Sequence, residues 1–170
     1  LLFGMLILYY YNFAVSNVLT ANIESLNMDE KIYPLWFQVT VFINFLIGFM
    51  LRIPFVPFHN WYPDIQSKAA APVNILMSGI ILNTGLYGLI RFNMQVFPEI
   101  FKLFAPVLMI WGLVNIIYAG ALSICQQGIK KMVSYANISA AGFIMVGLGC
   151  LNQTGFNGAI FTAIACAIVY

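Results

Sequence analysis

Apolar residues fill long stretches of this chain, and polar residues are concentrated in the short connections between them. About 20 apolar residues are enough for an α-helix to cross the ~30 Å hydrocarbon core of a bilayer. The pattern therefore predicts an all-α, multi-span transmembrane helical bundle that forms a single domain over residues 1–170. The six predicted helices cover residues 1–19, 34–58, 72–92, 103–125, 132–151 and 158–170.

Prolines interrupt the second of these stretches. Three of them fall within ten positions: Pro54, Pro57 and Pro63. Proline removes a backbone donor and clashes with the preceding helical turn. We therefore expect a broken helix near Arg52–Asp64, whose freed carbonyls a cavity or a neighbouring helix must satisfy.

Two ionisable side chains, Arg52 and His59, lie at this expected break. Ionisable groups at membrane depth usually mark a pathway for ions or protons. An imidazole titrates near neutral pH and can carry a proton, whereas a guanidinium stays charged and sets the local potential. Two alternatives stay open. Arg52 can extend its guanidinium to the membrane interface, and a lone histidine can be a structural hydrogen-bonding group.

Composition supports the membrane class. With 62% hydrophobic residues, 7% charged residues and a mean hydropathy of +0.93, the chain has too little polar surface to cover a soluble globule. We expect an integral, multi-pass protein whose surroundings are the lipid bilayer. The net charge of +2 is scattered and forms no basic tract, which excludes nucleic acid as a partner.

The cysteines carry no recognisable chemistry. Cys125, Cys150 and Cys166 form no Cys-x-x-Cys pair, so we interpret them as small buried hydrophobic residues rather than a disulfide or zinc site. We predict no metal site and no cofactor in this chain. The chain begins without Met, and its last apolar stretch is shorter than a span. We therefore expect a part of a longer protein.

Basic residues are unevenly distributed between the two predicted membrane faces. If the spans alternate in direction, the connections at 59–71 and 126–131 share one face. That face carries Lys68, Lys130 and Lys131. The count of basic residues favours it, by a small margin, as the cytoplasmic face.

A few polar residues lie within the spans. Asn74 and Ser78 share one helix face, as do Ser134 and Asn137, and Asn115 lies near the middle of its span. Such side chains either hydrogen-bond neighbouring helices in packed membrane interfaces or line a hydrated polar axis.

Three runs carry a family resemblance. Arg52-Ile-Pro-Phe-Val-Pro-Phe-His-Asn-Trp-Tyr-Pro-Asp64 resembles the Lys-x-Pro-x-x-Pro-x-His-x-Trp-x-Pro-Asp signature of the antiporter-like subunits of proton-pumping NAD(P)H:quinone oxidoreductase, or complex I. The runs Leu76 to Phe92 and Gly128 to Phe143 are similar to the segments that follow in the chain 4 type of subunit. These similarities cover about two thirds of the chain, in the family order.

The resemblance implies a fragment of the antiporter-like fold, in which broken helices lie at the centre of inverted repeats. It also implies a membrane-arm subunit of NAD(P)H:quinone oxidoreductase that takes part in proton translocation coupled to electron transport. The quinone would be plastoquinone or ubiquinone, and the partners would be other membrane subunits of the complex. The chain itself would hold no catalytic site.

This sequence departs from the family pattern at the buried titratable positions. Arg52 replaces the lysine of the broken helix, and Asn83 replaces the lysine of the next helix. Ala140 and Cys166 stand where the family has histidines. A proton relay needs groups that alternate between protonation states, so an unaltered relay is not expected.

We assign a candidate proton pathway to Arg52, His59, Asn83 and Lys130. Two alternatives remain open. One is a divergent, non-pumping scaffold subunit with the same fold. The other is a subunit of a cation:proton antiporter or of a membrane-bound hydrogenase from the same superfamily.

Overall fold

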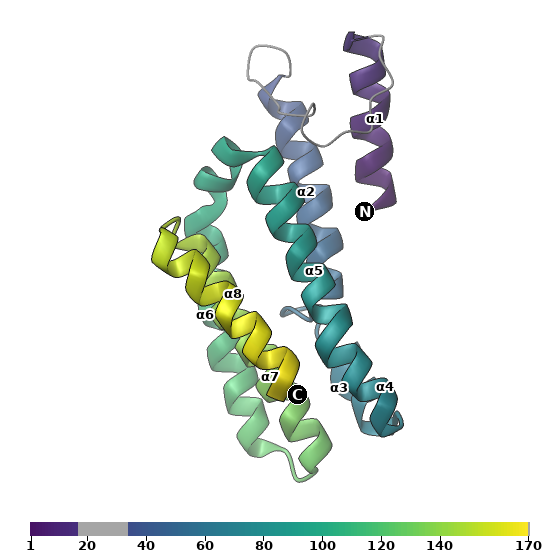
Figure 1. Ribbon diagram of the computed structural model, residues 1–170, viewed down its shortest axis with the longest axis vertical. Helices are drawn as coiled ribbons and strands as arrows, with labels where there is room; N and C mark the ends of the chain where they lie inside the picture. Colours follow the sequence, from purple (N-terminus) through teal and green to yellow (C-terminus); the bar gives the residue numbers. More distant parts are fainter. Residues whose placement is uncertain (17–33, 170) are drawn as a thin grey trace.

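The computed structural model describes residues 1–16 and 34–169, which form an elongated bundle of helices (Figure 1). In chain order the helices are α1 (Leu2–Ser16), α2 (Leu35–Arg52), α3 (Trp61–Lys68), α4 (Ala71–Leu76), the π-helical turn η2 (Met77–Ile81), α5 (Leu82–Gly88), the π-helical turn η3 (Leu89–Met94), α6 (Pro98–Cys125), α7 (Ile129–Gly149) and α8 (Gln153–Val169).

Four helical stretches of the described residues are long and apolar enough to cross a membrane: Leu35–Arg52, Ala71–Met94, Pro98–Cys125 and Ile129–Gly149. The second of these is a single rod in which α4, η2, α5 and η3 follow one another without a break. Leu2–Tyr11 and Gln153–Val169 are shorter apolar helices. The predicted all-α, multi-span class is confirmed.

The broken helix is present at the expected place. The α2 helix ends at Arg52, where the N–H of Ile53 still donates to the carbonyl of Phe49 at 2.8 Å. Non-helical backbone follows until α3 begins at Trp61. Pro54 lies directly after the last helical turn, because it has no N–H with which to continue the ladder.

Pro63 does not interrupt a helix. It lies in the first turn of α3, where backbone N–H groups have no intrahelical partner and a missing donor costs nothing. Only Pro54 and Pro57 therefore lie in the break. Asp64 in the first turn and Lys68 in the last turn of α3 both have the charge that suits the helix dipole.

Several helix ends differ from those that hydropathy predicts. The helix expected over 34–58 ends at Arg52, and the one expected over 103–125 begins at Pro98. Proline at the first helical position, followed by Glu99, suits a helix N-terminus. The helices expected to begin at 132 and 158 begin at Ile129 and Gln153. Their first turns contain polar residues, which hydropathy does not count as part of a span. For the helix expected over 1–19, residues 17–19 lie outside the described residues.

The core of one half of the bundle is aromatic. Phe42 of α2 meets Phe97 edge-on at a centroid distance of 6.2 Å, and Phe45 stacks on Phe92 at 5.5 Å. Phe49 lies against Gly88, where a Cβ atom would come within 2.1 Å of the Phe49 ring. Glycine at position 88 is therefore what lets α2 and α5 pack this closely.

A second interface joins α6, α7 and α8, which run together beside the α2–α5 pair (Figure 1). Gly112 of α6 and Gly142 of α7 face each other so closely that a Cβ atom on Gly142 would lie 2.8 Å from the Gly112 carbonyl oxygen. Gly147 and Gly155 bring α7 and α8 together in the same way. Small residues at such contacts allow close backbone approach in membranes.

Candidate functional site

The break between α2 and α3 is held by side chains of α6. The backbone N–H of Val56 donates to Asn115 Oδ1 at 3.1 Å, and the Val56 carbonyl accepts from Trp111 Nε1 at 2.6 Å. Asn115 is completely buried and also donates from Nδ2 to the Ile138 carbonyl of α7 at 2.8 Å. Both polar backbone groups of Val56 are thereby satisfied, as non-helical backbone at membrane depth requires.

His59 lies buried at the far end of this break, with 4% of its surface exposed. Its ring meets Tyr118 of α6 edge-on at a centroid distance of 5.3 Å and Tyr135 of α7 at 6.2 Å. Neither ring nitrogen has a hydrogen-bond partner among the described residues. A buried polar group without a partner is costly, so both ring nitrogens are open to a proton or to a further hydrogen-bonding group.

A column of buried polar side chains connects α3 to α7. The Tyr62 hydroxyl accepts from Gln66 Nε2 at 2.9 Å and from Asn137 Nδ2 at 2.6 Å. Ser134 Oγ lies 2.5 Å from Gln66 Oε1 and 2.7 Å from the Lys130 carbonyl, and its single proton serves one acceptor at a time. These groups lead from the first turn of α7 towards the break.

The other side of the break is apolar. The residues there pack without leaving room for a water molecule: Ile53, Phe55, Leu82, Leu86, Ala141, Ile144 and Met145. Beyond them the interior consists largely of the phenylalanine core around Phe42 and Phe45. Among the described residues, the hydrogen-bonded polar side chains of α3 and α7 lie on the side of the break at which α3 meets α4 and α6 meets α7.

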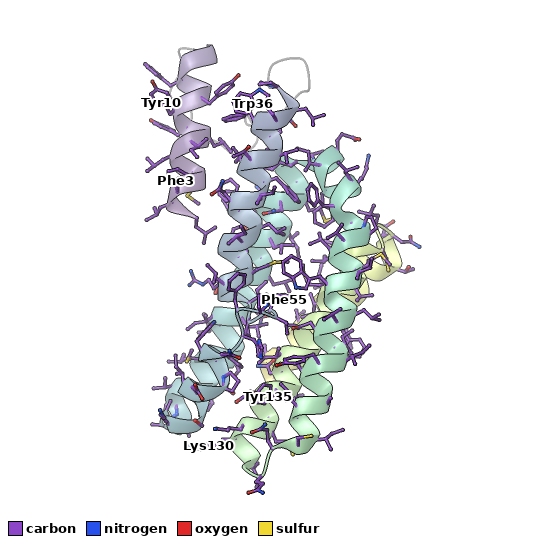
Figure 2. All side chains as sticks on the ribbon, turned by 180° about the vertical axis from the view of Figure 1, so that it is seen from behind. Phe3, Tyr10, Trp36, Phe55, Lys130 and Tyr135 are labelled. Carbon is purple, nitrogen blue, oxygen red and sulfur yellow. The ribbon has the colours of Figure 1, made fainter. Side chains whose placement is uncertain are left out.

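No hydrogen bond or ion pair joins the four predicted pathway residues in the described part of the chain. Arg52 lies in the last turn of α2 with an exposed side chain, and its Cβ is 3.5 Å from where a Cβ on Gly85 would lie. No ion pair of Arg52 occurs in the described part of the chain. Lys130 is exposed in the first turn of α7 and donates to the Ala69 carbonyl at 3.3 Å, at the end of the bundle (Figure 2).

Asn83 is half-buried on α5, directly after the π-helical turn η2. Its Nδ2 donates to the Gly79 carbonyl of the preceding turn at 2.7 Å. Its Oδ1 is buried without a partner among the described residues. The amide oxygens of Asn74, Asn93 and Asn137 share this property in the described part of the chain. Asn83 differs from them in its place directly after a π-helical turn, a feature that is frequent at functional sites.

Sequence reasoning missed most of the residues that surround His59. It noted Asn115, Ser134 and Asn137 as interior polar groups without assigning them partners. It did not single out Tyr62 and Gln66, although their spacing of four puts them on one helix face. It did not identify Tyr118 and Tyr135 either, because aromatic residues are frequent throughout this hydrophobic chain and nothing in the sequence sets these two apart.

Metal coordination has no candidate among the residues that the structure describes, where no group of three or more His, Cys, Asp or Glu side chains gathers.

These features define a multi-pass helical membrane protein with a discontinuous helix at a buried polar site, an arrangement typical of secondary transporters. The sequence model of the family described as "NADH:quinone oxidoreductase/Mrp antiporter, TM" matches residues 1–169. The chain belongs to this family, and the resemblance read from the sequence is confirmed.

The characterised relatives are of the chain 4 type. NAD(P)H-quinone oxidoreductase chain 4 from the chloroplast of Lotus japonicus is 41% identical over 150 residues, which are 88% of this chain and 30% of that protein. The chain 4 protein of Acaryochloris marina is 39% identical over 151 residues, 89% of this chain and 28% of that one. The chain thus spans about a third of the length of these relatives.

A solved structure shares the fold. The match lies in the membrane-bound sulfane sulfur reductase, an archaeal respiratory membrane complex. The TM-score is 0.81 at 24% identity, over 98% of this chain and 29% of that one. Together with the apolar spans, the family match confirms an integral, multi-pass membrane protein.

Proposed function

We propose that this chain is part of a membrane-arm subunit of an NAD(P)H:quinone oxidoreductase and takes part in proton translocation coupled to electron transport. The family membership and the identity of about 40% to chain 4 proteins support the assignment. The observation that carries the mechanism is His59, a buried imidazole at a helix break whose two ring nitrogens have no partner in the described part of the chain.

His59 is the group that takes up and releases the proton, because an imidazole is the side chain that titrates most readily near neutral pH. The Tyr118 and Tyr135 rings enclose it. The column of Tyr62, Gln66, Ser134 and Asn137 supplies a polar route from the end of the bundle where α7 begins. The dry apolar packing around Phe55 blocks the opposite direction.

Electron transfer takes place on other subunits in this proposal, and the chain itself holds no cofactor, metal or catalytic site. The relatives are named as chain 4 of NAD(P)H-quinone oxidoreductases of chloroplasts and cyanobacteria, which favours plastoquinone as the acceptor. Other membrane subunits of the complex are the expected partners. Arg52, which is exposed at the break, sets the electrostatic potential along the path of the proton.

A His59→Gln variant of the full-length protein, assembled in its complex and reconstituted into vesicles, tests the mechanism. Proton uptake per quinone reduced is followed with a pH-sensitive dye. We expect the variant to reduce this ratio, since glutamine keeps a hydrogen-bonding side chain and cannot carry a proton. Phe58→Leu, at the neighbouring partly exposed position, is the matched control and should keep the ratio. An unchanged ratio in His59→Gln would contradict the role of His59.

A non-pumping scaffold is the second candidate, and two observations favour it. Asn83, Ala140 and Cys166 occupy the positions that the family resemblance assigns to lysine and histidine. The buried partners around Tyr62 are amides and hydroxyls, which bond to one another without changing protonation state. Under this candidate both His59→Gln and Phe58→Leu leave the proton ratio unchanged, while the complex loses subunits when the chain is removed.

A further inference from the structure

Three lysines gather at one end of the bundle, which we call the lysine end. It is formed by Lys68 at the end of α3 and by Lys130 and Lys131 in the first turn of α7. Lys130 Nζ donates to the Ala69 carbonyl at 3.3 Å, so the two helix ends are in contact although they lie 61 positions apart. All three lysines are exposed, and Figure 1 shows the α3–α4 and α6–α7 turns at the same end.

The charge of the lysine end is not balanced. Among the described residues, the acidic side chains are Asp64 and Glu99. Glu99 lies at the start of α6, towards the opposite end, and pairs with Lys102 at 2.8 Å. Among the described residues, Asp64 is thus the one carboxylate at the lysine end, on the same short helix as Lys68. Its single negative charge faces the positive charges of three ammonium groups.

The N-terminus of α7 adds to this positive potential. Its first residue is Ile129, and the preceding Gly128 has no side chain that could cap the free backbone N–H groups. The N-terminus of a helix carries a partial positive charge and attracts anions. This contribution supports the lysines and does not define a site without them.

Apolar side chains surround the lysines on the side that faces the spans. Ile129 is 77% exposed, and Ile65 and Met132 are each more than 40% exposed. A hollow of about 340 Å³ lies on α3 between Asp64, Ile65, Lys68 and Ala69. Since α7 crosses the membrane, its first turn lies at the depth of the lipid headgroups.

We infer that the lysine end binds the phosphate of an anionic glycerophospholipid. Ammonium groups are effective point-charge partners for phosphate, and basic clusters at the ends of membrane helices attract acidic lipids. The lysine stems lie along apolar surface while their charged ends reach the headgroup. The acyl chains then lie against Ile65, Ile129 and Met132. The inference is independent of whether the chain pumps protons.

Lipid binding by the full-length protein in its complex tests this inference. The protein is delipidated in detergent and mixed with phosphatidylglycerol and phosphatidylcholine, and the lipids that stay bound are counted by native mass spectrometry. We expect a preference for phosphatidylglycerol that falls in the triple variant Lys68→Gln, Lys130→Gln, Lys131→Gln. Each lysine contributes roughly fivefold in affinity. Lys102→Gln, at the ion-paired lysine near the other end, is the matched control and should keep the preference.

Two outcomes would overturn the inference. One is a triple variant that is assembled normally and still prefers phosphatidylglycerol. The other is displacement of the bound lipid by an excess of inorganic phosphate, which would make the site one for the free anion. If the triple variant does not assemble, the single variants Lys68→Gln and Lys131→Gln decide the question, because neither removes the contact between Lys130 and Ala69.

Discussion

The side-chain carbonyl of Asn115 accepts a hydrogen bond from the backbone N–H of Val56 at 3.1 Å, across 59 positions of the sequence. The same side chain donates to the Ile138 carbonyl at 2.8 Å. One residue of α6 therefore fixes the break of the α2–α3 helix and also bonds to α7. Without it, the backbone N–H of Val56 would be left unpaired at membrane depth, where water cannot replace the lost partner.

Replacing this residue should be strongly destabilising. For Asn115→Leu we expect the free energy of unfolding in detergent micelles to fall by about 1–3 kcal/mol, because the buried N–H of Val56 loses its partner and the bond to the Ile138 carbonyl is lost. Asn44→Leu is the matched control, since Asn44 donates only within its own helix, to the Thr40 carbonyl. Equal losses in the two variants would show that Asn115 has no special role at the break.

The second bond to the break is testable with an aromatic ring kept at the position. In the structure, Trp111 Nε1 donates to the Val56 carbonyl oxygen at 2.6 Å. Trp111→Phe removes this donor and should lower the free energy of unfolding by about 1 kcal/mol. Trp36→Phe, at a position that is 67% exposed, should cost less. In the double variant with Asn115→Leu, the two losses should not add, because both side chains bond to the backbone of the same residue, Val56. Strict additivity would mean that they act separately.

The Tyr62 hydroxyl should hold α3 against α7. In Tyr62→Phe both Gln66 Nε2 and Asn137 Nδ2 lose their acceptor, so we expect faster amide hydrogen exchange throughout α3, measured by mass spectrometry. Tyr87→Phe, at a position that is 65% exposed, serves as the control and should leave the exchange unchanged. Unaltered protection of α3 in Tyr62→Phe would rule out the hydroxyl as the main tie.

Close packing of α2 on α5 depends on one glycine. A Cβ atom in Gly88→Ala would lie 2.1 Å from a ring carbon of Phe49, and overpacking of this kind typically costs about 1–3 kcal/mol. Gly158→Ala has nothing within 4 Å of the new methyl group and lies inside α8, where alanine is the better helix former. Thermal unfolding should separate the two variants, and a stable Gly88→Ala protein would contradict the packing described here.

The break between α2 and α3 shows which features of the fold can be predicted from the sequence. Apolar run length predicts the spans, and Pro54 together with Pro57 predicts the interruption, because both are local properties of the chain. Hydropathy does not predict α3, since eight residues with a mixed composition and Pro63 in their first turn give no apolar run. The bond between Val56 and Asn115 joins positions far apart in the chain, which no local pattern encodes.

The candidate site shows the same limit. His59 is visible in the sequence as a lone titratable residue at a proline-rich break, but its neighbours Tyr118 and Tyr135 come from helices whose packing is set by Gly112 and Gly142. Lys130 looks like a pathway residue by resemblance. In the structure it lies at the end of the bundle, because α7 begins one residue before it.

Native purification of the full-length protein from membranes, with mass spectrometry of everything that accompanies it, tests the central proposal most directly. We predict that subunits of an NAD(P)H:quinone oxidoreductase accompany the chain at a constant ratio, and that NAD(P)H-dependent quinone reduction accompanies them. Recovery of the protein alone, or with subunits of a cation:proton antiporter or a hydrogenase and without quinone reduction, would contradict it.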